Sequence, residues 1–572
     1  MSQGRDPIDL SAIIHELGSF GRYQRVIYVL VCLPVMFSAL YNANYVFVAG
    51  IINYRCQVPQ CENRPPEYQP GSWASFALPP DAKDQKCYRM ESTKFECTPD
   101  AFVNKTVKCD SWVYETDETI VEAYDLGCQE WKRTLVGSIN SAGIFLALPY
   151  TSYLSDTYGR KVAFIVTAFC NGLVGLIRSW SVNYYMHIVL EFFNSVLGSG
   201  VYSTGYILAL EMVGVSHRVL GGNLLSSVFA IGQVLLGLVA WANPHWRSLL
   251  RILCIPSLFF LLYYFVIDES VRWLIVRQKK KQVIKIINKA ARFNKVTFSD
   301  RIQKMLDAYE SNNARQSIEE KADFDKQNSI VQVMKSVKLM VRVMICSFWW
   351  ITVTFVYYGL SINAVSLAGN KYLNYVFMSL MELPGYLLSY LVLDVIGRKR
   401  TLMIAFFICG VGLLTIPWIP STLPGLFTAV ILLSKMMISG AFSAIYVYTV
   451  ELFPTCARHR LLGACSMFGR IGNMMAPLTP MLMQYWESLP FLLFGLFSFT
   501  ASALMLLTPE TLNKALPDTI EQAENIDLQL KDPHFIDKGP KMLRRLSMGK
   551  SPKIETPDKK TSEGSTGQQG NK

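Results

Sequence analysis

Twelve long apolar blocks constrain the fold of this chain more than any other feature of its sequence. Each block is long enough to cross a bilayer, which takes about 20 residues of helix. The blocks fall near residues 25–52, 133–154, 161–180, 184–213, 220–242, 246–267, 341–365, 371–394, 400–419, 422–452, 461–485 and 490–508. Helices satisfy their own backbone hydrogen bonds in lipid. The sequence therefore predicts an all-α integral membrane protein with twelve transmembrane helices.

The placement of Lys and Arg predicts the orientation of these helices. Segment 268–340 carries 16 Lys or Arg and 9 Asp or Glu, and loops rich in basic residues remain in the cytoplasm. Because the number of spans is even, the amphipathic N-terminus (1–24) and the polar tail (509–572) are expected on the same side. Segment 53–131 is then an extracellular loop.

Six of the thirteen cysteines lie in segment 53–131. They are Cys56, Cys61, Cys87, Cys97, Cys109 and Cys128. Oxidising conditions outside the cell would let them form disulfides, but the sequence does not select a pairing. The sequon Asn104-Lys105-Thr106 lies in the same segment and predicts glycosylation of Asn104. The chain has no CxxC pair and no HExxH motif, so we expect no metal site.

One charged turn occurs twice and divides the chain into two halves. SDTYGRK at 155–161 is matched by LDVIGRK at 393–399. The matched ionisable residues are Asp156 with Asp394, Arg160 with Arg398, Glu211 with Glu451, Arg218 with Arg458, and Glu269 with Glu510. The pattern predicts two six-helix bundles, 25–267 and 341–508, joined by a central loop. Duplicated bundles around a midplane site are typical of transporters that open alternately to the two sides.

The repeated charges are expected to form a conformational latch at the cytoplasmic helix ends. The candidate latch residues are Asp156, Arg160, Glu211, Arg218, Glu269, Asp394, Arg398, Glu451 and Arg458. Pairs that form in one state and separate in the other would favour the outward-open state by about 1 kcal/mol each. The alternative is that these charges only set the topology after a hairpin, but two copies in register favour a latch.

Several motifs resemble those of a known family. DxxGRK after the second and eighth spans is similar to the signature of the major facilitator superfamily. WVYETDETIVEAYDLGC (112–128), DESVRWL (268–274) and YVYTVELFPTCAR (446–458) resemble the organic cation, carnitine and anion transporter family within it. SKMMISGAFSAIYVYTVELFPT (434–455) is most similar to the carnitine and organic cation branch. The resemblance implies a plasma-membrane carrier of small charged organic solutes without a cofactor.

Three ionisable residues inside apolar spans are candidates for the substrate site. Glu382, Lys435 and Arg470 are of the kind that usually face a cavity, pair with one another or serve function. By resemblance, Glu382 stands where cation and carnitine carriers have a carboxylate, and the two basic residues stand where carnitine and anion carriers have basic residues. Glu382 is therefore expected to face a substrate ammonium, with Lys435 and Arg470 balancing it or holding a carboxylate. The alternative is that the three only pair with one another for structure.

Aromatic residues complete the predicted pocket. Trp350 and Tyr357 lie seven residues apart, on one face of a helix, and match aromatic positions in the pocket of the family. Ring faces attract alkylammonium groups. Further pocket candidates are Tyr41, Tyr45, Tyr202, Gln233 and Tyr446. Glu191 departs from the family, because many members carry Arg at that point.

The predicted function is secondary transport of small organic cations or zwitterions by alternating access. The alternatives are an organic anion exchanger and a solute sensor that does not transport. The expected partners are the solute, membrane lipid and a coupling ion, whereas no aromatic-interleaved basic patch predicts nucleic-acid binding. An enzyme is not expected, because the six histidines are scattered. In the tail, Ser547 follows two arginines and is a candidate for phosphorylation.

Overall fold

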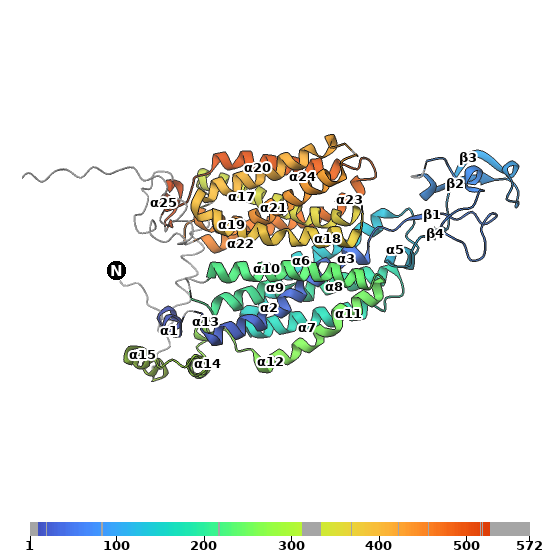
Figure 1. The fold of residues 1–572 in the computed structure, drawn as a ribbon. Coiled ribbons are helices and arrows are strands. Elements are labelled where there is room, and N and C mark those ends of the chain that lie inside the picture. Colours follow the sequence, from blue (N-terminus) through green and yellow to red (C-terminus); the bar gives the residue numbers. More distant parts are fainter. Residues whose placement is uncertain are drawn as a thin grey trace, which may run out of the picture.

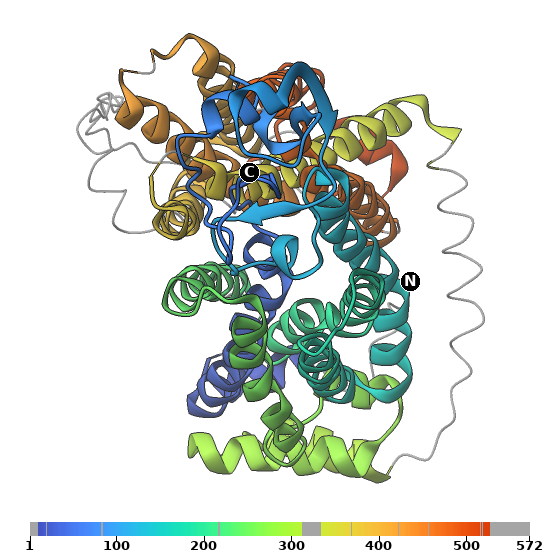
Figure 2. The same cartoon turned by 90° about the vertical axis from the view of Figure 1, so that its right-hand side faces the viewer.

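Two bundles of long helices lie side by side, and a small domain projects from one end of them (Figures 1 and 2). The computed structural model describes residues 10–526 except 19, 82–83, 215–217, 312–332, 334, 368, 421, 456, 515 and 518. We call the end with the small domain the loop-domain end. The opposite end carries the helices that connect the two bundles, and we call it the linker end (Figure 1). Ser547 lies outside the described residues.

The first half consists of helices that precede residue 268. They are α2 (Arg22–Ala43), α3 (Tyr45–Val48), α6 (Glu130–Tyr158), α7 (Arg160–Arg178), α8 (Tyr184–Gly198), α9 (Gly200–Glu211), α10 (Arg218–Ala242), α11 (Trp246–Leu258) and α12 (Tyr263–Val266). The second half consists of α17 (Val337–Asn363), α18 (Lys371–Leu380), α19 (Glu382–Ile396), α20 (Arg398–Thr415), α21 (Pro424–Leu452), α22 (Arg458–Met475), α23 (Thr479–Leu482) and α24 (Leu489–Leu504). The two sets form the two six-span bundles of an all-α membrane fold, which confirms the predicted fold class.

Within the described residues, nine helices are long and apolar enough to cross a membrane by length and composition alone. The three remaining predicted spans, 133–154, 184–213 and 461–485, correspond to α6, to α8 with α9, and to α22 with α23. The second of these is divided at Ser199 into helices of 15 and 12 residues. α22 carries Arg458, Arg460 and Arg470. These spans pack against other helices of the bundles, so packing compensates for their polar side chains.

The loop domain is the one part of the chain with β-structure among the residues that the structure describes. Its elements are β1 (Tyr54–Cys56), α4 (Ala74–Ala77), β2 (Tyr88–Ser92), β3 (Phe102–Lys108), β4 (Trp112–Tyr114) and α5 (Ile120–Ala123). β1 pairs antiparallel with β4, and β2 with β3, where a bulge lies between Met90 and Glu91. The cysteines pair as Cys56–Cys109, Cys61–Cys97 and Cys87–Cys128. Such cross-links stabilise small domains with little core.

Short helices lie at the linker end of both bundles. They are α1 (Leu10–Glu16), α13 (Val271–Val276), α14 (Lys280–Asn294), α15 (Asp300–Ser311) and α25 (Ile520–Glu524). Asn294 of α14 donates to Leu17 O at 2.9 Å and accepts from Tyr23 N at 2.8 Å. α25 is tied to α17 by Arg342, which donates to Ala523 O. The linker helices are therefore fixed to the ends of the bundles.

Candidate functional site

A fully buried carboxylate lies in the second half. Glu382, the first residue of α19, has no exposed surface. Its Oε2 accepts hydrogen bonds from the Tyr357 hydroxyl at 2.7 Å and the Tyr386 hydroxyl at 3.3 Å. Its Oε1 lies 3.0 Å from Lys435 Nζ. A charge is tolerated in such a place only when it is paired and hydrogen-bonded, and these contacts provide both.

The ammonium of Lys435 is equally buried. It donates to Ser361 Oγ at 2.8 Å and to the carbonyl oxygen of Tyr357 at 3.2 Å. It also lies 3.4 Å from the centroid of the Tyr357 ring, and a cation over a ring face is attracted to it. An ammonium group between a carboxylate and an aromatic face is the arrangement that the sequence predicted for a substrate, but here it is made by a side chain of the protein.

Tyrosines from both halves lie next to this ion pair. Tyr202 and Tyr206 of α9 stack with ring centroids 6.0 Å apart. Tyr446 of α21 lies near both of them and meets the ring of Trp350 edge-on at 4.5 Å. Trp350 is buried, and its indole N–H donates to Thr449 Oγ1 at 3.3 Å. Tyr446 is 42% exposed and lies near Tyr206 of the first half, so its ring is accessible to solvent.

Gln233 joins the ion pair to the first half. Its side chain is buried on α10, and its Nε2 donates to the Tyr357 hydroxyl at 2.9 Å. That hydroxyl donates in turn to Glu382. A second link between the halves, from Ser443 Oγ to Asn223 Oδ1 at 3.0 Å, lies closer to the linker end. The candidate site is therefore part of the contact between the halves.

Two of the weaker pocket candidates lie elsewhere. The Tyr41 hydroxyl donates to Leu253 O at 3.2 Å, within the first half. Tyr45 lines a small pocket at the loop-domain end together with Arg133, Ile362 and Pro477. Neither position brings the tyrosine to Glu382.

Arg470 stands apart from the Glu382–Lys435 ion pair. It lies half-buried on α22, near Tyr358 and Tyr446. Among the described residues it makes no hydrogen bond and no ion pair. Of the three ionisable residues, Glu382 and Lys435 pair with each other, as the structural alternative requires. Arg470 does not take part in this pairing and lies beside the tyrosines.

The first copy of the repeated turn forms a cluster of charges at the linker end. Arg160 begins α7, and its guanidinium lies 2.9 Å from Asp156 Oδ1 and 3.7 Å from Glu211 Oε2. The Glu269 carboxylate accepts from the backbone N–H of Lys161 at 3.1 Å, at the positive end of the α7 dipole. Burial raises the pKa of the Glu269 carboxyl. The side chain of Arg218, at the start of α10, is not among those that the structure describes.

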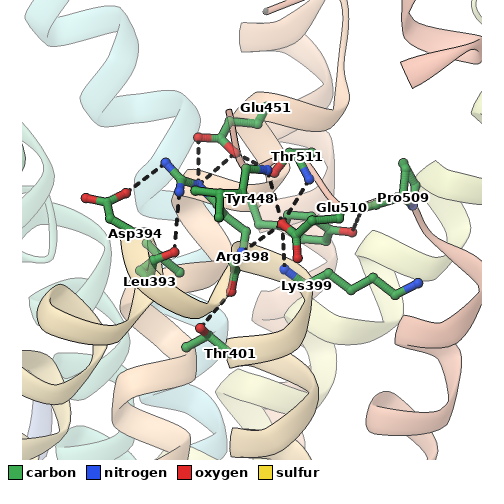
Figure 3. Close-up of polar contacts among 12 residues, drawn as sticks. Leu393, Asp394, Arg398, Lys399, Thr401, Tyr448, Glu451, Pro509, Glu510 and Thr511 are labelled. Carbon is green, nitrogen blue, oxygen red and sulfur yellow. Dashed lines mark hydrogen bonds and ion pairs between the residues drawn. The ribbon is translucent and has the colours of Figure 1, made fainter. Parts of the chain in front are cut away.

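The second copy repeats this geometry (Figure 3). Arg398 begins α20 and lies 2.9 Å from Asp394 Oδ1 and 3.2 Å from Glu451 Oε2. Glu510 accepts from the backbone N–H of Arg398 at 2.9 Å, as Glu269 does in the first half. Arg458 donates to the carbonyl oxygens of Phe453 and Pro517 at 3.3 and 3.5 Å. Glu510, which the sequence matched to Glu269, thus belongs to the cluster.

These contacts bear on one part of the latch prediction. The sequence argument required the charge pairs to separate when the halves move. In the structure, Arg160 and its carboxylate partners all belong to the first half, and Arg398 and its partners all belong to the second. Each cluster therefore ties helices within one half, and a rigid-body movement of the halves leaves it intact.

Two ion pairs that involve helices of the bundles are among those not predicted from the sequence. Glu118, in the loop before α5, lies 2.6 Å from the ammonium of Lys371 at the start of α18, and joins the halves at the loop-domain end. Arg178 and Glu191 form a pair within the first half, and both side chains are 0% exposed. The sequence marked Glu191 as unusual but gave no sign of its partner on the preceding helix.

The chain matches known transporters over most of its length. The family model described as "Sugar (and other) transporter" matches residues 80–522. The "Organic cation transporter protein" of Drosophila melanogaster is 31% identical over 524 residues, which cover 90% of this chain and 94% of that protein. "Solute carrier family 22 member 3" of Mus musculus is 30% identical over 538 residues, covering 90% and 95%. "Organic cation/carnitine transporter 2" of the same species is 29% identical over 535 residues, covering 90% and 94%.

A solved structure shares the fold. The inward-open xylose transporter XylE from E. coli superposes with a TM-score of 0.55 at 15% identity, and covers 87% of this chain and 99% of that one. Two matched six-helix halves with buried ionisable groups where they meet define a membrane transporter and not an enzyme. The chain belongs to the sugar (and other) transporter family of the major facilitator superfamily, and within it to solute carrier family 22, with an organic cation transporter among its relatives.

Proposed function

We propose that this transporter moves small organic cations or zwitterions bearing an ammonium group by alternating access. The observation that carries the proposal is the Lys435 ammonium, which lies between the Glu382 carboxylate and the Tyr357 ring. A site that accommodates one alkylammonium in this way has the chemistry to accept another. The printed names of the relatives, organic cation transporter and organic cation/carnitine transporter, support the same class of solute.

The proposed substrate site combines this ion pair with the tyrosines beside it. Glu382 and the Tyr357 ring receive the ammonium, and Lys435 or Arg470 receives a carboxylate where the solute has one. Trp350, Tyr446, Tyr202 and Gln233 form the walls of the site. Because Gln233 and Tyr202 belong to the first half and the other groups to the second, the site is completed only when the two halves approach each other.

We propose that the loop-domain end faces the outside of the plasma membrane. The domains are then a cytoplasmic N-terminus (1–24), a first bundle (25–267) with its extracellular loop (53–131), a cytoplasmic central loop (268–340), a second bundle (341–508) and a cytoplasmic tail (509–572). The three disulfides suit an oxidising compartment. Asn104 is exposed on β3, where a glycan meets no obstacle. Spans without charged faces contact lipid.

We further propose that the clusters around Arg160 and Arg398 brace the linker ends of the two halves. Each cluster combines ion pairs with a carboxylate at a helix N-terminus, a favourable place for an anion. A braced half moves as a rigid unit, which alternating access requires.

The organic anion exchanger remains the second candidate function. Arg470, which has no carboxylate partner among the described residues, favours it, and so does Lys435, whose ammonium could receive a carboxylate of the solute. A sensor that binds solute without moving it is the third candidate, and it would show binding without uptake.

Uptake into cells that express the protein tests these proposals. The panel contains radiolabelled carnitine, tetraethylammonium, β-alanine and a dicarboxylate, each with and without sodium. We expect uptake of the ammonium-bearing solutes, and the sodium arm decides whether a coupling ion takes part. Uptake of the dicarboxylate alone would refute the role of Glu382. Cells that express Glu382→Gln test the role of this carboxylate. Cells that express the exposed variant Lys108→Gln at the same level control for expression and for the loss of one charge.

A further inference from the structure

The unloaded site already holds a cation. Lys435 Nζ lies 3.0 Å from Glu382 Oε1 and 3.4 Å from the centroid of the Tyr357 ring. These are the two contacts that the proposed function assigns to the ammonium of the substrate. The protein therefore fills this cation position with one of its own side chains.

This occupancy leaves the Glu382–Lys435 pair without net charge. Glu382 and Lys435 are both 0% exposed, and a carboxylate at this depth is strongly unfavourable when it has no counter-charge. A carrier that returns empty must bury its site between the halves without a solute. With Lys435 in place, the empty carrier buries no net charge from this pair.

We propose that Lys435 is a tethered counter-cation, which occupies the cation position of the site in the unloaded carrier and yields it when the substrate ammonium arrives. The inference rests on the proposed function, since it concerns the same site. It assigns to Lys435 a positioning role in the return of the empty carrier, in addition to any contact with a substrate carboxylate.

The surroundings of Lys435 let it yield without losing its own partners. Its ammonium donates to Ser361 Oγ at 2.8 Å and to Tyr357 O at 3.2 Å, both on α17. These acceptors remain when Glu382 turns to the substrate. When Lys435 Nζ shifts slightly away from Glu382, it loses its contact with that carboxylate and can contact the carboxylate of a zwitterionic substrate instead. Lys435 keeps its hydrogen bonds to Ser361 and Tyr357 during this shift.

The mechanism predicts a difference between net transport and exchange. Net efflux requires the empty carrier to return, whereas exchange uses only loaded carriers. Removing the counter-cation leaves Glu382 unpaired in the empty state alone, because the substrate ammonium pairs it in the loaded state. Lys435→Gln should therefore slow net transport far more than exchange.

The test uses the full-length protein in proteoliposomes preloaded with radiolabelled carnitine or, in a parallel set, tetraethylammonium. Efflux is measured into buffer without solute and into buffer with the same unlabelled solute. We expect the ratio of net efflux to exchange efflux to fall about tenfold or more in Lys435→Gln. The double variant Glu382→Gln/Lys435→Gln, which removes both charges, should return the ratio towards that of the unmodified protein.

Glu382→Gln provides a second single variant, in which Lys435 is left unpaired in the empty carrier and the ratio should also fall. Either single variant carries the test if the other does not fold. Exposed Lys108→Gln on β3 should leave the ratio unchanged. If the folded single variants had the same ratio of net efflux to exchange efflux as the unmodified protein, the proposed role of Lys435 as a counter-cation would be refuted. If the unmodified protein moved neither probe even in exchange, the proposed function itself would fail.

Discussion

The turn between α19 and α20 gives the most direct test of the structural reasoning. Gly397 has φ 111° and ψ 155°, a region that only glycine occupies without strain. A Cβ at this position would also lie 2.8 Å from Cδ of Glu510. Gly397→Ala therefore strains the backbone and displaces the carboxylate that caps α20 (Figure 3).

The two effects set the expected magnitude. Forcing a residue with a Cβ into this backbone region costs about 1–3 kcal/mol. Loss of hydrogen bonds from backbone N–H groups to the Glu510 carboxylate costs about 1.5–3 kcal/mol. The free energy of unfolding should therefore fall by about 2.5–6 kcal/mol, towards the lower end because Glu510 is only half-buried.

The assay is thermal unfolding of the purified protein in detergent, followed by size-exclusion chromatography with fluorescence detection. Gly463→Ala is the matched control, because a Cβ there meets no atom within 4 Å and alanine is favoured over glycine inside a helix by about 1 kcal/mol. Glu510→Ala and the double variant Gly397→Ala/Glu510→Ala separate the clash from the backbone strain. If Gly397→Ala unfolded at the same temperature as Gly463→Ala, the reasoning would be refuted.

Three further predictions concern ion pairs and the sequon. Glu118→Lys should slow transport, because it places two cations at the loop-domain contact between the halves, where the ion pair contributes about 0.2–1 kcal/mol. The charge exchange Glu118→Lys/Lys371→Glu should restore transport. Uptake by the double variant no faster than by the single variant would contradict the contact. Arg178→Met should lower the free energy of unfolding by about 3–5 kcal/mol, and adding Glu191→Gln should recover most of this in the same thermal assay; no recovery would argue against the pair. Asn104→Gln should abolish the shift in electrophoretic mobility that glycosidase treatment produces, and an unmodified protein without such a shift would count against an outward-facing loop domain.

The fold was largely predictable because its signals are local and repeated. Apolar blocks of helical length predicted an all-α membrane protein, and the duplicated DxxGRK turns predicted the two halves; the transporter fold and family are confirmed. The sheets of the loop domain were missed, since strands as short as Tyr54–Cys56 and Trp112–Tyr114 carry too few residues to show an alternating pattern. Disulfide pairing was equally out of reach, because it depends on the path of the loop and not on spacing.

The candidate site was predictable only as a set of residues. Glu382, Lys435 and Arg470 were identified because charges are rare in apolar spans. Which of them pair depends on how each helix is rotated about its axis, and this is decided by packing across the whole bundle. For the same reason no sequence pattern indicated that Glu118 would meet Lys371, which lies 253 positions further along the chain.

The confinement of each charge cluster to one half has a consequence for how substitutions act on the chain. Arg160 pairs with Asp156 and Glu211, and Lys161 N–H donates to Glu269, without any residue from the second half. Arg398 likewise finds Asp394 and Glu451 within the second half. Loss of either arginine therefore leaves the ion pairs of the other cluster with all their partners.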